Sequence, residues 1–270
     1  MLDPSRFRVI PGSQVNLSSQ DPDSKEGFDG GKQEGKAALQ DLNHRLADFQ
    51  ARLWAESEQR LLVVLQAMDT GGKDGTIRNV FKGVNPQGVE VRSFGRPTEL
   101  ELAHDFLWRV HPHVPGDGNI TIFNRSHYED VLAVRVRELV PEDRWRQRYQ
   151  HINDFERLLT DEGTTIVKLF LHISPAEQRA RLQARLDDPS KRWKFRHGDL
   201  EDRKLWGRFQ AAYEEALTRT STEIAPWYLV PANRKWYRNL VVSSILIDTL
   251  ETMGPKFPEP EASLDGVIVT

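Results

Sequence analysis

The stretch Leu61-Leu-Val-Val-Leu-Gln-Ala-Met-Asp-Thr-Gly-Gly-Lys-Asp-Gly-Thr76 decides the fold of this chain. Its first half is apolar from Leu61 to Leu65 and again at Ala67, and such a run predicts a buried strand of a parallel sheet. Two glycines and a lysine follow, and helical spacing continues from Thr76 to Lys82. A strand, a glycine turn and a helix N-terminus form a phosphate cradle, because backbone N–H groups and the helix dipole face the anion.

The match to the P-loop pattern G-x-x-x-x-G-K-[ST] is imperfect at two positions. Ala67 takes the place of the first glycine, and Asp74 takes the place of the Ser or Thr that binds magnesium. The strand before the turn and the helix after it supply the context that the motif requires, so phosphate binding is favoured over an ordinary strand–helix connection. The predicted phosphate-binding residues of this turn are Thr70, Gly71, Gly72, Lys73, Asp74, Gly75 and Thr76.

Length and composition limit the alternatives. The chain has 270 residues, which fits one α/β domain, a formal net charge of −3 and no cysteine. The absence of cysteine excludes disulfides, thiolate metal sites and thiol catalysis. No apolar run approaches the ~20 residues that span a bilayer, and the N-terminus lacks the apolar core of a signal peptide. We therefore expect a cytoplasmic protein with no membrane partner and no nucleic-acid partner, whose polyanion binding, if any, relies on a local basic patch.

Further apolar runs at 88–94, 118–123, 163–173 and 226–230 predict four more strands, and helical patterns separate them. Helices are expected at 32–58, from Thr98 through Val110, from about 130 to 161, from Ser174 onward, from about 199 to 220 and at 236–251. This alternation predicts a parallel five-stranded sheet flanked by helices, with the ligand at the carboxyl ends of the strands. We expect residues 1–30 to form an extended arm, 31–254 a single domain and 255–270 a tail.

The first long helix carries an apolar seam, in which Leu39, Leu42, Leu46, Phe49 and Leu53 recur at steps of three and four. Such a seam packs either on the core of its own domain or against a second copy of the chain. The pattern leaves both open, and it makes a homo-oligomer a reasonable expectation.

Polar side chains follow the first and third strands, where the ligand is expected. Asp69 precedes the glycines, and Asn124-Arg-Ser-His-Tyr-Glu-Asp130 follows the third strand. Phosphoryl transfer requires positioning and charge neutralisation, usually with magnesium held by carboxylates. Asp69, Glu129 and Asp130 are therefore the candidate metal ligands, although acids at a helix start are also favoured without any function. Arg125 is a candidate bidentate clamp on phosphate, and Ser126 beside it a candidate binding residue.

A dense basic segment from Arg179 to Lys204 predicts a helical lid, at about 185–204, that closes over phosphates. The alternative is a solvated face, but the flanking acids lie outside the stretch from Lys191 to Arg196. Further cations around the cradle would line a channel for a long phosphate ligand. The candidate residues are Arg185, Lys191, Arg192 and Lys194 in the lid, with Arg78, Lys82 and Arg96 near the cradle.

Together these motifs resemble the polyphosphate kinase 2 family. The resemblance runs from about Gly30 to Leu250 and rests on five segments in the right order. They are Ala67-Met-Asp-Thr-Gly-Gly-Lys-Asp-Gly75, Arg96-Pro-Thr98, Phe123-Asn-Arg-Ser-His-Tyr128, Asp188-Pro-Ser-Lys-Arg-Trp-Lys-Phe195 and Ala225-Pro-Trp227.

The resemblance implies a thymidylate-kinase-like P-loop fold. It also implies magnesium-dependent, reversible phosphoryl transfer between inorganic polyphosphate and a nucleotide. Asp69 and Lys73 match the aspartate and lysine of the family's first motif, and Arg125 matches the arginine of its second. Lys191, Arg192 and Lys194 fall in its lid.

One departure carries information. Most of the family has aspartate at the position of Asn124 and tryptophan at that of His127, and the form seen here looks like the class III branch, which phosphorylates both nucleoside monophosphates and diphosphates. A neutral Asn124 removes one negative charge near the acceptor, which would ease the approach of the doubly charged phosphate of AMP. It leaves open which carboxylates hold the metal.

The sequence therefore predicts a cytoplasmic kinase that transfers phosphate from polyphosphate to AMP and ADP. Lys73 and the turn amides would bind the transferring phosphates, while Asp69, Asn124 and Arg125 would surround the reacting groups. Mg²⁺ is the expected ion, with Mn²⁺ as an alternative, and guanine nucleotides are further candidate substrates. Two rival hypotheses are a kinase that uses ATP as donor to a small acceptor, and a non-catalytic polyanion binder.

Overall fold

A computed structural model describes residues 2–261, so that residues 262–270 of the predicted tail lie outside the described part. Five parallel strands form one sheet in the order β2-β3-β1-β4-β5. The predicted five-stranded parallel sheet is confirmed. The strands are β1 (Arg60–Ala67), β2 (Val89–Ser93), β3 (Ile120–Asn124), β4 (Thr164–His172) and β5 (Trp227–Pro231).

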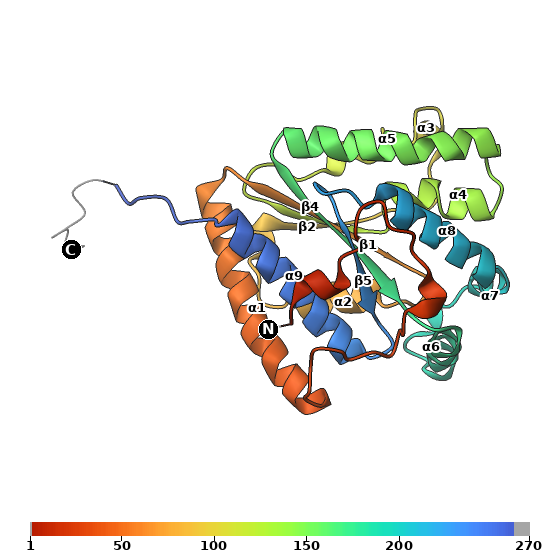
Figure 1. The fold of residues 1–270 in the computed structure, drawn as a ribbon, viewed down its shortest axis with the longest axis horizontal. Helices are drawn as coiled ribbons and strands as arrows, with labels where there is room; N and C mark the ends of the chain where they lie inside the picture. Colours follow the sequence, from red (N-terminus) through yellow and green to blue (C-terminus); the bar gives the residue numbers. More distant parts are fainter. Residues whose placement is uncertain (1, 262–270) are drawn as a thin grey trace.

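The central strands are nearly continuous apolar runs because helices cover both faces of the sheet (Figure 1). One layer consists of α1 (Lys32–Glu56), α2 (Lys73–Val80) and α9 (Lys235–Met253). The other consists of α4 (Ala133–Val136), α5 (Glu142–Asp161) and α8 (Trp206–Thr220). Strand β2 lies at one edge and is largely exposed, whereas β1 in the centre is buried along seven of its eight residues.

The apolar seam of α1 packs within the chain. Leu42, Leu46 and Leu53 are buried, and α1 lies along α9, as Figure 1 shows. These three residues therefore belong to the core of this domain, whereas Leu39 and Phe49 of the same seam are half-buried.

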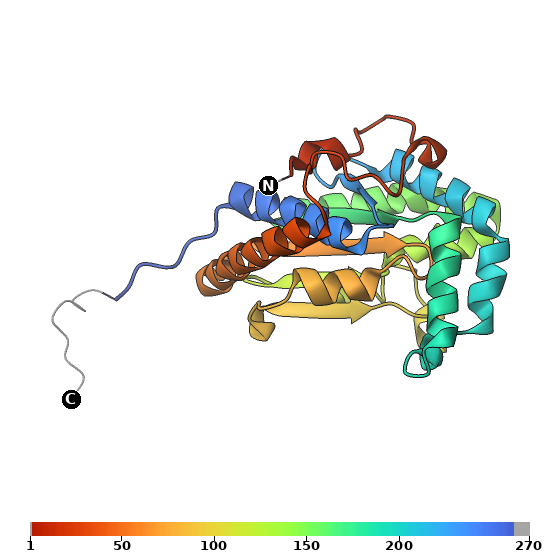
Figure 2. The same cartoon turned by 90° about the horizontal axis from the view of Figure 1, so that it is seen from below.

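A helical segment stands across the carboxyl ends of the strands (Figure 2). It comprises α6 (Pro175–Asp187), a 3-10 turn η6 (Arg192–Lys194) and α7 (His197–Lys204), after which α8 returns along the sheet. Ser174 caps α6 by accepting a hydrogen bond from the N–H of Glu177 at 3.1 Å, with Pro175 in the first turn. The predicted lid region thus spans the end of α6, η6 and α7.

The N-terminal segment lies against the edge of the sheet at β5. It contains two short 3-10 helices, η1 (Pro4–Phe7) and η2 (Leu17–Ser19). The N–H of Val9 donates to the carbonyl of Trp227 at 2.8 Å, and the N–H of Asn233 donates to the carbonyl of Pro22 at 3.0 Å. Its buried side chains include Leu2, Phe7, Val9 and Leu17.

The helix predicted from Thr98 through Val110 is wrong beyond its first turn. Thr98 and Glu101 form a capping box at the start of this segment, but α3 (Glu99–Leu102) ends after four residues. The Asp105 carboxylate accepts hydrogen bonds from the N–H groups of Leu107 at 2.9 Å and Trp108 at 3.1 Å. These local bonds compete with the helix, and the remaining residues form turns and a 3-10 helix η4 (His111–His113).

Two other helices differ from prediction. The expected helix at 199–220 is divided at Leu205 into α7 and α8. Helix α2 (Lys73–Val80) ends two residues before Lys82, so the helix expected to continue to Lys82 is shorter than predicted. Gly83, at φ +95°, stands in the left-handed conformation that favours chain reversal here. Among residues 2–261, no helix is both long and apolar enough to cross a membrane.

Candidate functional site

The glycine turn between β1 and α2 is closely packed. The N–H of Gly71 donates to the carbonyl of Met68 at 2.9 Å. A Cβ on Gly71 would overlap the Cβ of Ala67 and lie 2.8 Å from that carbonyl oxygen, so residue 71 must be glycine. Thr70 has φ +64°, which is strained for a β-branched residue, and Gly72 has φ +107°. Strained backbone of this kind persists where the surrounding structure enforces it, and it is concentrated at functional sites.

Lys73 begins α2 inside the turn. Its side chain is 8% exposed, and Nζ donates to the carbonyl of Ala67 at 3.0 Å. Burial and the neighbouring Arg125 lower the pKa of Lys73 to about 8, against the opposing effect of Asp69. The lysine therefore lies as a poorly solvated cation at the point where the sequence places a phosphate.

Asp69 and Arg125 form an ion pair across the ends of β1 and β3, with 2.6 Å between Oδ1 and Nη2. Burial alone would raise the pKa of Asp69, but the charges of Arg125 and Lys73 outweigh it and hold that pKa below its ordinary value. Arg125 has φ +62°, and its N–H donates to the carbonyl of Leu65 at 3.1 Å. The backbone thus fixes Arg125 beside the cradle, where its guanidinium can contact both a carboxylate and a phosphate.

Asn124, at the end of β3, forms a hydrogen bond with Asp74 of the turn. Its Nδ2 donates to Oδ1 of Asp74 at 2.9 Å, and the other oxygen of Asp74 lies 3.5 Å from Nζ of Lys194 in the lid. An aspartate at position 124 would place two carboxylates side by side with no donor between them. The neutral residue at 124 and the acid at 74 are therefore complementary, and Lys194 links them to the lid.

The two acids after the third strand have different surroundings. Glu129 faces the charges of Arg125 and Lys73, although burial is the larger influence and raises its pKa. Asp130 instead pairs with Arg148, at 2.7 Å from Nη1, and burial raises its pKa to about 6. Ser126 is buried and accepts from the N–H of Tyr128 at 3.2 Å, which makes it a brace of the loop.

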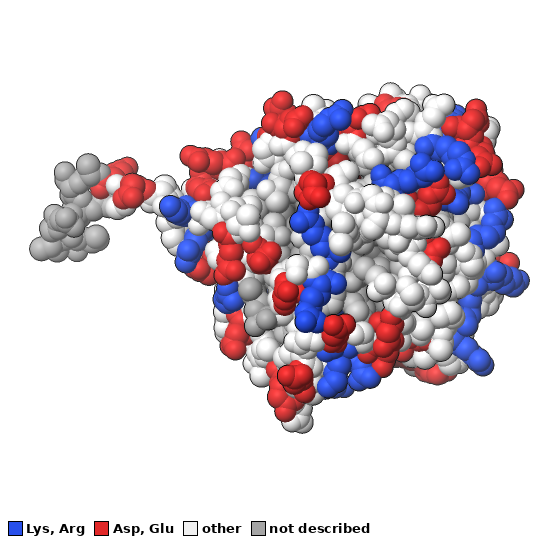
Figure 3. Space-filling model, viewed as in Figure 1, with Lys and Arg blue, Asp and Glu red and all other residues white. Residues whose placement is uncertain are grey.

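The predicted cations are distributed unevenly. Arg78, Lys82 and Arg96 are exposed, and Lys82 lies beyond the end of α2, whereas Lys194 reaches Asp74 of the turn. The lid residue Arg185 lies 3.9 Å from Asp199. Lys191 pairs with Asp188, and Arg192 donates to the carbonyl of Leu186 at 2.7 Å. Figure 3 shows lysines and arginines gathered along the side of the molecule where α6 and α7 lie.

Two residues of α6 support the turn and were not singled out from the sequence. Nη1 of Arg181 donates to the carbonyls of Thr70 and Gly71, each at 3.0 Å, and Nε2 of Gln178 donates to the carbonyl of Asp69 at 3.1 Å. Arg181 lies within the basic segment, but charge density alone could not distinguish a buried carbonyl-binding arginine from a solvent-facing one.

A buried polar network lies behind the loop that carries Arg125. Nζ of Lys168 donates to Glu156 at 2.5 Å, to the hydroxyl of Tyr128 at 2.9 Å and to the carbonyl of Thr220 at 2.6 Å. Nε2 of His127 lies 3.4 Å from Glu156, and the Lys168 and Glu156 side chains are at most 1% exposed. No local sequence pattern indicates this network, because its members are far apart in the chain.

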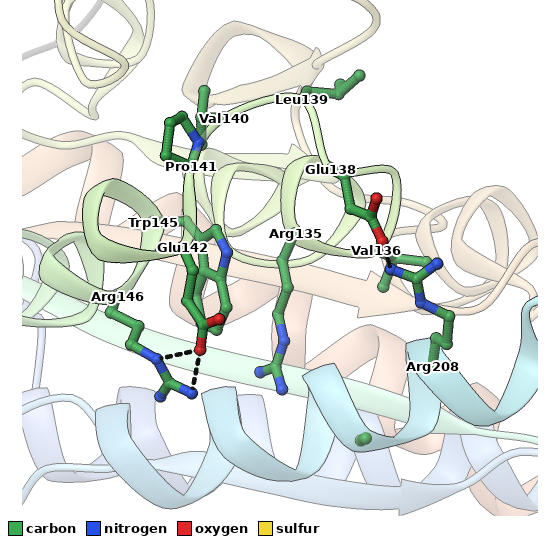
Figure 4. A pocket seen from close by; sticks show the side chains of 11 residues that line it. Arg135, Val136, Glu138, Leu139, Val140, Pro141, Glu142, Trp145, Arg146 and Arg208 are labelled. Carbon is green, nitrogen blue, oxygen red and sulfur yellow. Dashed lines mark hydrogen bonds and ion pairs between the residues drawn. The ribbon is translucent and has the colours of Figure 1, made fainter.

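A surface pocket of about 720 Å³ lies elsewhere, among α4, α5 and α8 (Figure 4). Arg146 pairs there with Glu142 at 2.6 Å, and Arg208 with Glu138 at 2.6 Å. Because these guanidiniums already have carboxylate partners, the pocket does not offer the free positive charge that a phosphate site requires. The cradle is the candidate active site.

Comparison with known proteins agrees with this geometry. The model of the polyphosphate kinase 2 family matches residues 30–258. The chain belongs to the polyphosphate kinase 2 family. It is 60% identical, over 98% of its length and 99% of the relative's, to the AMP/ADP-polyphosphate phosphotransferase of Meiothermus ruber. It is 38% identical, over 76% of its length and 43% of the relative's, to the polyphosphate:AMP phosphotransferase of Pseudomonas syringae.

The crystal structure of polyphosphate kinase 2 from Arthrobacter aurescens superposes with a TM-score of 0.92 at 47% identity, over 96% of this chain and 92% of that one. The predicted P-loop kinase fold is confirmed, and the chain is a phosphotransferase of the kinase class.

A phosphotransferase of this family works with a divalent metal ion, and the donor set here fits one. Among residues 2–261, no group of three or more acidic or histidine side chains is arranged to hold a metal by itself. Magnesium is commonly bound by one or two carboxylates together with substrate phosphates and water. The charges of Asp69 and Glu129 both act on Lys73 at the start of the cradle helix, whereas Asp130 interacts with Arg148 and Arg109 instead.

Proposed function

We propose that this kinase transfers a phosphoryl group from inorganic polyphosphate to both AMP and ADP, reversibly. The observation that carries the proposal is the neutral Asn124 at the end of β3, hydrogen-bonded to Asp74 beside Asp69, Arg125 and Lys73. The similarity to the AMP/ADP-polyphosphate phosphotransferase of Meiothermus ruber supports it.

The proposed reaction is an in-line displacement. A phosphate oxygen of the nucleotide forms a bond to the terminal phosphorus of polyphosphate, the bridging P–O bond breaks, and the shortened chain leaves with the electron pair. Lys73 and the turn amides hold the transferring group, and Arg125 neutralises charge that develops on it. No protein nucleophile is required, since the acceptor phosphate is itself the nucleophile.

We assign the metal ion, Mg²⁺ or Mn²⁺, to Asp69 and Glu129 in preference to Asp130. When bound, the ion supplies positive charge that neutralises the phosphate oxygens and helps align donor with acceptor. The protein's part is to keep Asp69 ionised, which the charges of Arg125 and Lys73 favour, and to exclude water when the lid closes.

Phosphorus NMR of the purified kinase with magnesium, polyphosphate and AMP, without added ATP, tests the proposal. ADP and then ATP resonances should grow as polyphosphate is consumed. Product from ADP alone would refute the dual-acceptor assignment, and product with ATP as donor but none with polyphosphate would favour an ATP-dependent kinase of a small acceptor.

The matched variant is Asn124→Asp, which restores a charge next to Asp74. It should impair AMP phosphorylation more than ADP phosphorylation, because aspartate is the residue that most of the family carries at this position, whereas the neutral residue is typical of the branch that accepts both nucleotides. An equal loss for the two acceptors would contradict the role given to Asn124. Guanine nucleotides as acceptors and a homo-oligomeric state remain predictions, which the same assay with GMP and GDP and analytical ultracentrifugation test.

A further inference from the structure

A second arginine, from α9, lies directly under the glycine turn. Arg238 is 2% exposed. A Cβ on Gly72 would overlap Nη1 of Arg238, and a Cβ on Gly75 would lie 3.4 Å from Nη2. The guanidinium can therefore approach this part of the cradle only because residue 72 is glycine, whereas a Cβ at position 75 would only touch it.

Arg238 has no carboxylate partner among residues 2–261. Its Nε and Nη2 donate to Oδ1 of Asn239, at 3.1 and 2.7 Å, and its nearest charged neighbour is another cation, Arg181. Burial, together with Arg181, lowers the pKa of Arg238 to about 9, so it is charged at pH 7. A buried charge without a counter-charge destabilises the folded protein.

Arg181 differs from Arg238 in having a partner for its charge. It is also buried, but its Nε pairs with Glu177 at 2.7 Å and its remaining donors reach four backbone carbonyls. Arg181 is thus satisfied as a structural residue, whereas Arg238 has positive charge left over.

The excess of positive charge extends to the surface of α9. Lys235 lies one turn before Arg238 and is exposed. Partial burial of its side chain lowers its pKa most, and the positive charge of Arg181 is the next largest cause of the lowering. Arg238 and the lid residue Lys191 lower that pKa further, while Glu177 opposes them. The first turn of α9 therefore adds two cations to one side of the cradle, and the acid nearest to them, Glu177, is held by Arg181.

We propose that Arg238 is a positioning residue for phosphate, whose missing counter-charge is the polyphosphate held in the cradle. It acts through the field it creates behind Gly72 and Gly75 and through the shape it gives the turn, without contacting the reacting atoms. The inference rests on the proposed function in that polyphosphate is taken as the anion. It adds a binding contribution from α9 to those of the turn and the lid.

The test compares Arg238→Met, which removes the charge and keeps most of the volume, with Arg238→Lys, which keeps the charge. Arg234→Met is the matched control, since Arg234 lies one turn earlier, is half-exposed and pairs with Asp23 at 2.5 Å. The probe is inorganic tripolyphosphate, with binding measured by calorimetry and apo stability by thermal unfolding.

Arg238→Met should bind tripolyphosphate about tenfold more weakly, as expected for loss of one nearby charge in a poorly solvated site. Its apo melting temperature should stay level or rise, because an uncompensated buried charge has been removed. Arg238→Lys should retain most of the affinity, and Arg234→Met should bind within about twofold of the parent.

A structural role would give the opposite pattern, with a lower apo melting temperature and unchanged tripolyphosphate affinity in Arg238→Met, and that result would overturn the proposal. If Arg238→Met does not fold, weak binding by a folded Arg238→Lys would overturn it as well, because the charge is still present. If Arg234→Met and Arg238→Met lose tripolyphosphate affinity equally, the loss follows from the change in net charge and the proposal is overturned.

The nucleotide assay separates this inference from the proposed function. A parent enzyme that phosphorylates AMP, together with an Arg238→Met variant of unchanged affinity, refutes only the inference. A parent that binds tripolyphosphate but does not phosphorylate nucleotides refutes the function and leaves the inference standing. A parent that binds no tripolyphosphate refutes both.

Discussion

The substitution Glu156→Gln examines the buried network behind the loop of Arg125. Glutamine keeps the shape of the side chain and can still accept the hydrogen bond from Tyr128, which is 2.8 Å long in the parent. It removes the carboxylate bonded to Lys168, whose side chain is 0% exposed. Leaving one member of a buried pair uncompensated costs about 3–5 kcal/mol, which for a domain of this size corresponds to a melting temperature lower by roughly 6–15 °C.

Urea unfolding followed by tryptophan fluorescence at pH 7 measures this loss. The control is Glu142→Gln, which breaks a largely exposed i,i+4 pair with Arg146 and should cost less than about 1 kcal/mol. The double variant with Glu156→Gln and Lys168→Met should recover most of the loss, because no unpaired charge then remains in the core.

The pH dependence has a definite sign. Burial opposes ionisation of Glu156, but Lys168 outweighs it, so the folded-state pKa of Glu156 lies below its ordinary value of 4.5. Its contribution to stability is therefore full above that value and is lost as the pH falls through the folded-state pKa. The stability difference between parent and Glu156→Gln should shrink in that acid range.

Two results would refute this reasoning. One is a Glu156→Gln variant that loses no more stability than Glu142→Gln, which would mean that the buried charge of Lys168 is compensated by other groups. The other is a double variant as unstable as the single one, which would attribute the loss to packing instead of charge.

Three further predictions concern the cradle. Asp69→Asn should lower kcat at least about 100-fold in the phosphorus NMR or coupled assay while leaving the unfolding curve unchanged, and near-normal turnover would remove Asp69 from the mechanism. Lys73 loses its proton as the pH rises through about 8, so kcat/KM for polyphosphate should fall in that range. If the same fall in kcat/KM persists in the variant Lys73→Arg, another group is responsible for it. Gly72→Ala should lower the free energy of unfolding by about 1–3 kcal/mol and weaken phosphate binding, because φ at residue 72 is +107° and the new methyl group would displace Arg238. The control is Gly207→Ala in α8, which has open space around it and should be neutral or stabilising.

Short-range pattern was sufficient for much of the fold. The apolar run from Leu61 to Leu65 predicted β1, and the alternation of strands with helices predicted a parallel sheet, since a strand buried on both faces has few other arrangements. The pattern failed from Ala103 to Val110, where a single Asp105 side chain competes for backbone N–H groups. Helix propensities and apolar spacing do not include this competition between a side chain and the helix for backbone N–H groups.

Part of the candidate site could also be predicted from the sequence. Residues that follow strand ends lie close together, because a parallel sheet brings the carboxyl ends of its strands to one edge. The structure accordingly places the glycine turn, Lys73, Asp69 and Arg125 in one cluster, as the sequence predicted. The roles of the side chains in catalysis and metal binding stay predictions. Asp130 shows the limit, because its partner Arg148 lies on α5 and no local pattern links the two.

The sequence by itself determined the family, the order of the strands along the chain and the chemistry available at the turn, because each depends on residues that are neighbours or follow one another at fixed spacing. The tertiary structure alone decided which charges are paired. Arg181 and Arg238 are both buried arginines near the glycines, yet only Arg181 has a carboxylate partner. Burial and pairing depend on which distant side chains the folded chain brings within a few ångströms, and that distance governs the free energy of a charge in a poorly solvated interior.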